Sequence, residues 1–358
     1  MPTNAHIHTN HSFSVFASPQ AVVDAAVAAG LSGVGVNDFF TTSGFAEFRA
    51  AAARARLPTV YCVECISMDA QAEQAGELYN DPANPGRIYL GGKGIARPDA
   101  PRAQAVFAEI RRHQEARNRA LVAKADAHIR AKGFAAGPAW QDVVGQTPHG
   151  NTTERHVAKA ILGRIRELGG ADAYAAIVGE APKGDDAGQQ NQIRAQLLKA
   201  GKPCYVPEDR AAFPSVEVLR DAFLSMGAVP TYPILGNPVT ACEKDIPALF
   251  DRLDRWGFRA VEVISTRNTD DRLLAIIAEC ARRGWPVSDG TEHNTPAMEP
   301  MLTKWAADPR FEPAFSDGFA VFLGHQRLVE QGQPGYVDAA GARLPGGLER
   351  CRAAGRAV

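Results

Sequence analysis

Short hydrophobic runs and amphipathic segments alternate along the first part of the chain. Two apolar runs after the opening His6-Ile7-His8 are typical of buried strands, and the segment before each has apolar residues at helical spacing. In chain order these segments are 19–30, 33–37, 44–56 and 58–64. Ser18-Pro19 and Gly30 are residues that often begin and end a helix. This alternation predicts a parallel sheet with helices packed outside it.

The same alternation returns near residue 207, after a stretch of different character. Strands are predicted at 228–232, 260–265 and 285–289, and helices at 215–226, 245–256 and 270–283. The stretch between is rich in Ala, Arg, Lys, Gln and Glu and predicts several helices, of which the first runs from about 101 to 132. We therefore expect a barrel from 1–97 and 203–305, a helical insertion at 98–202 that covers the barrel mouth, and a C-terminal extension at 306–358 packed on the barrel.

Composition narrows the class of protein. The chain has 358 residues, of which 45% are hydrophobic and 22% charged, as in ordinary globular proteins. The formal net charge of −1 argues against binding to nucleic acid or membranes through bulk charge. We find no apolar run of membrane-spanning length and no secretion signal. Six scattered cysteines are typical of reduced thiols, so we expect a cytoplasmic protein. The oligomeric state is left open.

His6-Ile7-His8 is the first candidate for chemistry. Side chains alternate faces on a strand, so His6 and His8 point to one side and Ile7 to the other. A single His-x-His pair is more often incidental than a ligand pair, but Glu64 and Glu292 also fall at predicted strand ends. The carboxyl ends of parallel strands carry the chemistry in such folds. Imidazoles with carboxylates suit Zn, Mn or Fe, whereas the alternative is a set of ordinary polar residues.

Two cations are candidates for binding an anionic substrate. Arg267 follows a predicted strand and could clamp a carboxylate or phosphate, although a solvated loop arginine is an equal alternative. Gly91-Gly92-Lys93-Gly94 lacks the spacing of a phosphate loop, and we expect a turn in which Lys93 contacts substrate. Cys62 and Cys65 have a C-x-x-C spacing, but their side chains would point to opposite faces of a strand, so packing is the expected role.

Several stretches together resemble the opening of PHP (polymerase and histidinol phosphatase) domains, in particular the stand-alone bacterial phosphoesterase branch with a helical insert. They are His6-Ile7-His8-Thr9, Val36-Asn37-Asp38 and Val63-Glu64-Cys65-Ile66-Ser67. Residues 153–160 are similar to the insert motif of that branch, which adds His156 to the candidate substrate-binding residues. The resemblance covers roughly residues 4–300. It implies a distorted (β/α)7 TIM-like barrel and metal-dependent hydrolysis, typically of phosphate esters, at a site of up to three metals.

The departures from the family pattern imply a smaller metal centre. The ligand positions of one metal correspond to His6, His8, Glu64 and Glu292, which are all competent ligands. The second metal needs two histidines, and Tyr89 and Tyr232 stand in those places. The third needs an aspartate and two histidines, and its positions hold Phe13, Phe39 and Asn294. The resemblance therefore implies one divalent transition metal (Zn, Mn or Fe).

The leading hypothesis is a single-metal hydrolase that acts on a small anionic metabolite, with a non-phosphate substrate plausible because two metals are lost. Proton transfer is expected from His293, Asp38, Tyr89 or Tyr232, and His11 is a further substrate-binding candidate. One alternative is a phosphoesterase in which His11, Asp289 and His293 serve as substitute ligands. The others are a metal-dependent lyase or isomerase of a sugar acid, and an inactive module that keeps a metal for structure.

Overall fold

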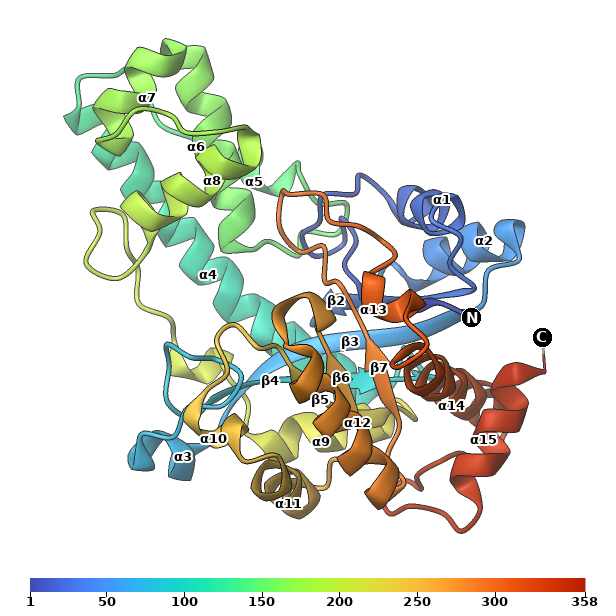
Figure 1. Cartoon of the computed structure of the whole chain (residues 1–358). Helices are drawn as coiled ribbons and strands as arrows, with labels where there is room; N and C mark the ends of the chain where they lie inside the picture. The colour runs from blue at the N-terminus through green and yellow to red at the C-terminus, as the bar shows by residue number, and fades with distance from the viewer. Residues whose placement is uncertain (358) are drawn as a thin grey trace.

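A computed structural model describes residues 1–357 of the chain. Within these residues the strands form one seven-stranded sheet in which spatial order follows chain order (Figure 1). The strands are β1 (Thr3–Ile7), β2 (Gly33–Phe39), β3 (Thr59–Met68), β4 (Arg87–Lys93), β5 (Val229–Ile234), β6 (Val261–Val263) and β7 (Val287–Asp289). All neighbours pair in parallel except β4, which is antiparallel to both β3 and β5.

The chain that follows β7 closes the sheet on β1. Ile7 and Glu292 form a parallel bridge, the Glu292 N–H donates to the His6 carbonyl at 2.8 Å, and the His8 N–H donates to the Glu292 carbonyl at 2.8 Å. The buried backbone N–H and C=O groups where the sheet closes are therefore hydrogen-bonded, as buried backbone groups of a strand must be. The predicted distorted seven-stranded barrel is confirmed.

The predicted turn at Gly91-Gly92-Lys93-Gly94 is wrong, because residues 91–93 belong to β4. Gly92 pairs with Val63 on one side and Pro230 on the other. A Cβ atom at Gly92 would lie 2.8 Å from the Phe223 ring, so only glycine lets the helix that carries Phe223 pack this closely on the strand. These glycines reflect close packing on a strand, although a run of glycines in a sequence is typical of a turn.

Helices cover the outside of the barrel (Figure 1). They are α1 (Pro19–Ala28), α2 (Phe45–Ala55), α3 (Ala70–Ala75), α9 (Val216–Ser225), α10 (Ala241–Lys244), α11 (Ile246–Trp256) and α12 (Asp270–Arg283), with 3-10 turns at Arg210–Ala212 and Ser265–Arg267. Ser18, Ser215 and Thr269 accept from backbone N–H groups in the first turns of α1, α9 and α12. These caps satisfy donors that the helix itself leaves free, which is why the starts were visible in the sequence.

A helical lobe interrupts the barrel between β4 and β5 and projects from it (Figure 1). It contains α4 (Pro101–Ala131), α5 (Trp140–Val144), α6 (Glu154–Leu168), α7 (Gly170–Val178), α8 (Asp186–Ile193) and a π-helical turn at Arg194–Leu198. The long helix α4 belongs to both parts. Phe107 and Ile110 pack in the barrel core, whereas Leu121 and Ile129 pack in the separate core of the lobe. The helix thus fixes the lobe to the barrel.

The C-terminal helices pack against the side of the barrel near β1, β3 and β7. They are α13 (Lys304–Ala307), α14 (Glu312–Glu330) and α15 (Gly347–Arg356). Cβ atoms at Gly324 and Gly355 would lie 1.8 Å from the carbonyl oxygens of Cys351 and Ala320, so α14 and α15 approach through their glycines. Among the helices of residues 1–357, we find none that is both long and apolar enough to cross a membrane.

Candidate metal centre and substrate cavity

Three ligand atoms converge at the end of β1 and the middle of β3. The Nε2 atoms of His6 and His8 lie 3.0 Å apart, and the Glu64 Oε2 atom lies 3.7 Å from the first and 3.4 Å from the second. All three side chains are buried. Ligand atoms about 2.0–2.1 Å from a tetrahedral zinc are ~3.4 Å from one another. The observed triangle therefore has the size that one metal ion requires.

Hydrogen bonds on the far side of each ring fix the histidine tautomers. His6 Nδ1 contacts the Glu262 carboxylate, which can only accept, so this nitrogen carries the proton. His8 Nδ1 lies 3.1 Å from Ser12 Oγ, and Ser12 Oγ donates to Asp38 Oδ1 at 2.6 Å. The Ser12 oxygen must then accept from His8. Both Nε2 atoms are left with lone pairs that point at the centre of the cluster.

Electrostatics also favour a cation at this point. Burial lowers the pKa of His8, which keeps the imidazole neutral and able to bind metal. Burial, reinforced by Glu292 and Glu262, raises the pKa of Glu64 to about 8. The Glu64 Oε2 atom is buried and accepts no hydrogen bond within the described chain. Two lone pairs and an unpaired carboxylate oxygen facing one another fit a metal ion.

Lys93 lies behind the cluster of His6, His8 and Glu64 and does not line the cavity that opens beside it. Its Nζ donates to the Ala5 carbonyl at 2.9 Å and forms an ion pair with Glu262, the partner of His6. Its side chain is 2% exposed. Burial tends to lower the pKa of Lys93, but Cys62 and Glu262 raise it. In turn, His6 and Lys93 hold the pKa of Glu262 at about 2. The predicted contact of Lys93 with substrate is therefore corrected: the lysine charge is used to anchor the Glu262 carboxylate.

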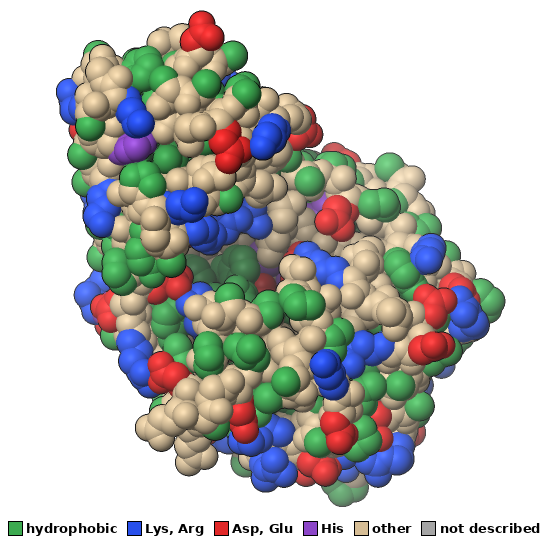
Figure 2. Space-filling model, turned by 60° about the vertical axis from the view of Figure 1, so that its left-hand side comes forward, with side chains coloured by type: hydrophobic (Ala, Val, Ile, Leu, Met, Phe, Trp, Pro, Cys, Tyr) green, Lys and Arg blue, Asp and Glu red, His purple; other side chains and the backbone are tan. Residues whose placement is uncertain are grey.

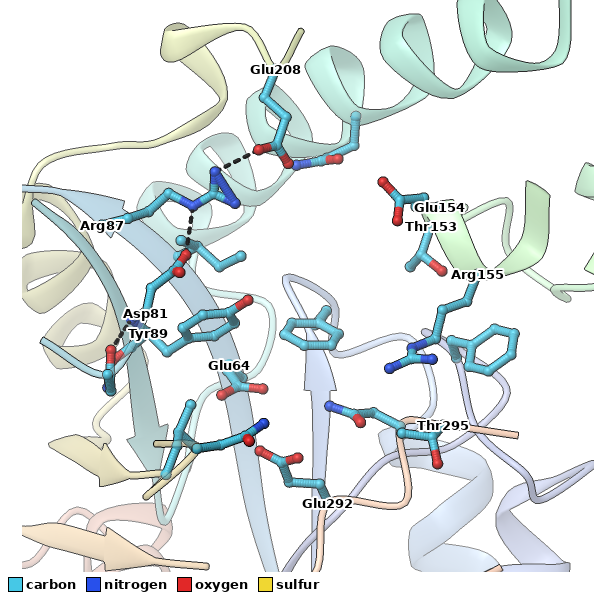
Figure 3. A pocket seen from close by; sticks show the side chains of 18 of the residues that line it. Glu64, Asp81, Arg87, Tyr89, Thr153, Glu154, Arg155, Glu208, Glu292 and Thr295 are labelled. Atoms are coloured by element: carbon cyan, nitrogen blue, oxygen red, sulfur yellow. Dashed lines mark hydrogen bonds and ion pairs between the residues drawn. The ribbon is translucent and has the colours of Figure 1, made fainter. Parts of the chain in front are cut away.

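A cavity of about 460 Å³ opens beside the cluster of His6, His8 and Glu64, where the helical lobe meets the barrel. Figure 2 shows the hollow between the two parts, with Lys and Arg side chains gathered on the lobe side. Barrel side chains form the floor and lobe side chains the facing wall (Figure 3). The charged residues that line it are Arg87, Arg117, Arg155, Arg194, Lys199 and Arg267, with Glu64, Asp81, Glu154, Glu208 and Glu292. A polar cavity with six cationic side chains can accommodate an anionic ligand.

Glu154 organises the lobe wall. Its carboxylate accepts from Arg117 Nη2 at 3.1 Å, Arg194 Nε at 3.0 Å and Lys199 Nζ at 2.6 Å. Burial alone would raise the pKa of Glu154, but Lys199 and Arg194 outweigh it and lower the pKa to about 2. Arg155 comes next in the chain and points into the cavity (Figure 3). Burial and the neighbouring Arg194 lower the pKa of Arg155 to about 10, so it stays protonated near neutral pH.

Glu292 and Arg267 both line the cavity. The Arg267 Nη2 atom donates to Glu292 Oε2 at 2.6 Å. Glu292 is not a member of the converging cluster of His6, His8 and Glu64. Its assignment as a metal ligand stays a prediction. Arg267 does not extend into solvent as a free loop arginine.

Tyr89 lines the cavity, whereas Tyr232 does not. The Tyr89 hydroxyl points into the space above Glu64 (Figure 3). Burial, with Asp81 nearby, raises the pKa of Tyr89, so its hydroxyl keeps its proton and can donate a hydrogen bond. Tyr232 is buried inside the barrel and donates to Glu243 Oε1 at 3.0 Å. Its position favours the packing role over contact with substrate.

Four further candidates lie outside the lining of the cavity. Asp38 accepts from the Thr9 N–H at 2.7 Å and from Ser12, so it orients His8 from behind. His11 Nδ1 lies 2.9 Å from Ser43 Oγ, and its ring stacks on His149 with centroids 4.7 Å apart.

His156 is buried, and its Nδ1 accepts from the Thr153 N–H at 3.0 Å as part of the cap of α6. Burial lowers its pKa to about 3. His293 has φ 55°, and its Nε2 donates to the Glu299 carbonyl at 2.9 Å, so it fixes the loop after β7. Direct contact of either histidine with substrate is therefore not supported by its place in the fold.

Sequence inspection missed the cations of the lobe. Arg155 lies inside the stretch 153–160 that drew attention for its motif, but only His156 was selected from it. Arg117, Arg194 and Lys199 were ordinary members of a charged helical region. Their common signal exists only in three dimensions, where separate turns of α4, α6 and the π-helical turn meet at Glu154.

No protein-family model and no curated protein sequence matches this chain. Solved structures are similar in fold. One is described as a putative metal-dependent phosphoesterase from Bifidobacterium adolescentis, with a TM-score of 0.59, 18% identity and coverage of 88% of this chain and 97% of the other. A second, an amidohydrolase from Chromobacterium violaceum, gives a TM-score of 0.58 and 20% identity over 84% of this chain and 93% of the other. The chain thus shares the barrel fold of these two proteins across most of its length.

Proposed function

We propose that the protein is a metal-dependent hydrolase with a single metal, which acts on a small anionic substrate. The observation that carries the proposal is the convergence of two histidine lone pairs and the unpaired Glu64 oxygen at the mouth of a barrel. Both similar structures are described as hydrolytic enzymes, a phosphoesterase and an amidohydrolase. The resemblance of the sequence to PHP domains supports the same class.

The environment of the cluster supports one metal in place of three. Phe13, Phe39 and Asn294 line the cavity at positions where the PHP pattern has ligands, and the Phe39 ring lies 4.6 Å from that of His8. The phenylalanine rings have no lone pair with which to bind a metal ion. Tyr232 is engaged with Glu243. Glu292 is the fourth ligand in this proposal, through the carboxylate oxygen that Arg267 leaves free.

Different residues of the site have different roles in the proposed hydrolysis. A bound divalent metal would polarise a substrate oxygen and lower the pKa of water. Glu262, through His6, and Asp38, through Ser12 and His8, hold the ligand rings in place. The protonated Tyr89 hydroxyl donates a hydrogen bond to the bound substrate. The cationic lobe wall attracts and orients the anion. We note that the Chromobacterium violaceum structure contains bound sulfate and no metal.

The test combines elemental analysis with turnover. Protein purified without chelator should contain one equivalent of Zn, Mn or Fe per chain, and it should hydrolyse amides or esters that carry a separate carboxylate or phosphate. Two or three metals per chain, with preferred release of phosphate from monoesters, would support the phosphoesterase instead. A metal-loaded protein that turns over none of these amides, esters and phosphate monoesters would contradict both hydrolase hypotheses and favour a binding module.

A further inference from the structure

One cation of the substrate cavity has no carboxylate partner. Arg87, Arg117, Arg194, Lys199 and Arg267 each form an ion pair, whereas Arg155 forms none within residues 1–357. Its Nη1 donates to Asn191 Oδ1 at 3.3 Å, and its guanidinium carbon lies 5.9 Å from the Phe13 ring centroid. A half-buried guanidinium without a counter-charge has lost hydration that an anion can replace.

The surroundings of Arg155 are positive. Three cations share the single carboxylate of Glu154, so the lobe wall has a surplus of positive charge even before Arg155 is counted. Arg155 also lies in the first turn of the 15-residue helix α6. The backbone N–H groups of Glu154 and Arg155 donate to no acceptor within residues 1–357. Free N–H groups and the helix dipole add partial positive charge next to the guanidinium.

The floor of the cavity has no such surplus of positive charge. Glu64, a member of the cluster, and Glu292 face the cavity, and Glu262 lies behind the cluster. Arg267 is paired with Glu292, and Lys93 is paired with Glu262. An anionic group that does not bind the metal is therefore attracted to the lobe wall and not to the floor. Figure 3 shows Arg155 and Glu292 entering the cavity from different walls.

We propose that Arg155, with the first turn of α6, binds an anionic group of the substrate that serves for recognition and does not react. The group is a carboxylate or a phosphate, which share the two-point geometry that a guanidinium binds. The substrate then has two ends: an anion held by the lobe and a hydrolysable bond at the metal cluster. The inference rests on the proposed function for the assignment of this cavity to substrate.

Anion binding to the full-length protein can be measured without turnover. The probes are inorganic phosphate and succinate, titrated at low ionic strength by calorimetry. The variant is Arg155→Gln, and the matched control is Arg166→Gln, an exposed lobe arginine paired with Asp186 that does not line the cavity. Loss of a charge-assisted hydrogen bond should weaken binding by roughly ten- to a hundredfold in Arg155→Gln. The control should bind like wild type.

Metal removal supplies the second arm of the experiment. Wild-type protein treated with chelator should bind the same probe with a Kd within about threefold of that of the untreated protein, since the proposed handle lies on the lobe wall. Binding of phosphate but not of succinate identifies the recognised group of the substrate as a phosphate, and binding of succinate identifies it as a carboxylate. Circular dichroism and melting curves check that Arg155→Gln is folded, and Arg155→Lys, which keeps the charge, should retain part of the affinity.

Three results would overturn the inference. They are absence of binding to wild type, equal binding by Arg155→Gln, and loss of binding when the metal is removed, which would place the anion on the metal. The proposed hydrolysis fails on different grounds, namely a metal-loaded protein without turnover. Anion binding that depends on Arg155 would still hold in that case, so the two failures are distinguishable.

Discussion

The Nη2 atom of Arg267 and the Oε2 atom of Glu292 lie 2.6 Å apart beside the cluster of His6, His8 and Glu64. The backbone of Glu292 is fixed between His6 and His8 by the hydrogen bonds that close the barrel, and its φ of 64° is in the left-handed region. A non-glycine residue in this conformation is held there by its surroundings. The pair therefore sets where the last carboxylate of the site can point.

Glu292→Gln should reduce metal affinity by about tenfold or more, because the amide replaces a charged ligand beside His8. Arg267→Met should change the affinity less, since it removes only the partner that orients the carboxylate. Metal content after dialysis against graded chelator checks both variants. Unchanged affinity in Glu292→Gln would assign this carboxylate to Arg267 alone and leave the metal with three protein ligands.

Replacing a member of the converging cluster should abolish metal binding without unfolding the barrel. His6→Ala, His8→Ala and Glu64→Ala each remove one of the three ligand atoms. The matched control is His128→Ala, because within residues 1–357 the ring of His128 hydrogen-bonds to the Ile177 carbonyl in the lobe and to no group of the cluster. Elemental analysis should find less than a tenth of the wild-type metal in the three variants and the full amount in the control. Retained metal in any of them would contradict the assigned site.

Lys93→Met should destabilise the protein by about 3–5 kcal/mol, because it leaves the buried Glu262 without its cation. Lys93 and Glu262 are 2% and 1% exposed, so solvent cannot replace the lost partner. The double variant Lys93→Met/Glu262→Gln should be more stable than Lys93→Met, since both charges are gone. Urea unfolding measures the difference. If Lys93 instead acted on substrate, Lys93→Met would lower activity and leave stability unchanged.

The two tyrosines should differ when each hydroxyl is removed. Tyr89→Phe should reduce turnover by roughly ten- to a thousandfold with unchanged metal content, the range for losing one hydrogen bond to the transition state. Tyr232→Phe should leave turnover near wild type and lower the free energy of unfolding by about 1–2 kcal/mol, because buried Glu243 loses a donor. Equal loss of turnover in both variants would show that Tyr232 also acts on substrate.

The lobe should lose stability at acidic pH through Glu154. Its pKa is lowered to about 2 in the folded protein, below the ~4.3 of a free glutamate. The ionised carboxylate therefore stabilises the fold above the unfolded pKa, and this contribution is lost as the pH falls through that range towards 2.

Melting curves of wild type and Glu154→Gln check this dependence. The difference in Tm should be constant above about pH 5 and shrink below it, and at neutral pH the variant should lose roughly 1.5–3 kcal/mol. A difference that does not change with pH would exclude the carboxylate as its cause.

The order of most strands and helices follows from local patterns in the sequence. Strands and helices differ in the period of their apolar residues, and capping residues mark helix starts such as Ser18 and Ser215. The alternation on β1 also placed His6 and His8 on one face before any contact was known. β4 was the exception, since Gly92 is required by contact with Phe223, which lies far away in the chain.

Which candidates face the cavity depends on contacts between distant parts of the chain. Lys93, Asp38, His156 and Tyr232 are polar residues near strand or helix ends, yet each is turned towards a partner within the protein. Arg155 becomes a candidate only in the structure, where it lines the cavity and forms no ion pair within residues 1–357. Local pattern fixes the direction of a side chain on its own element. The partner that satisfies its charge comes from residues up to hundreds of positions away, and that pairing is set by the folded chain.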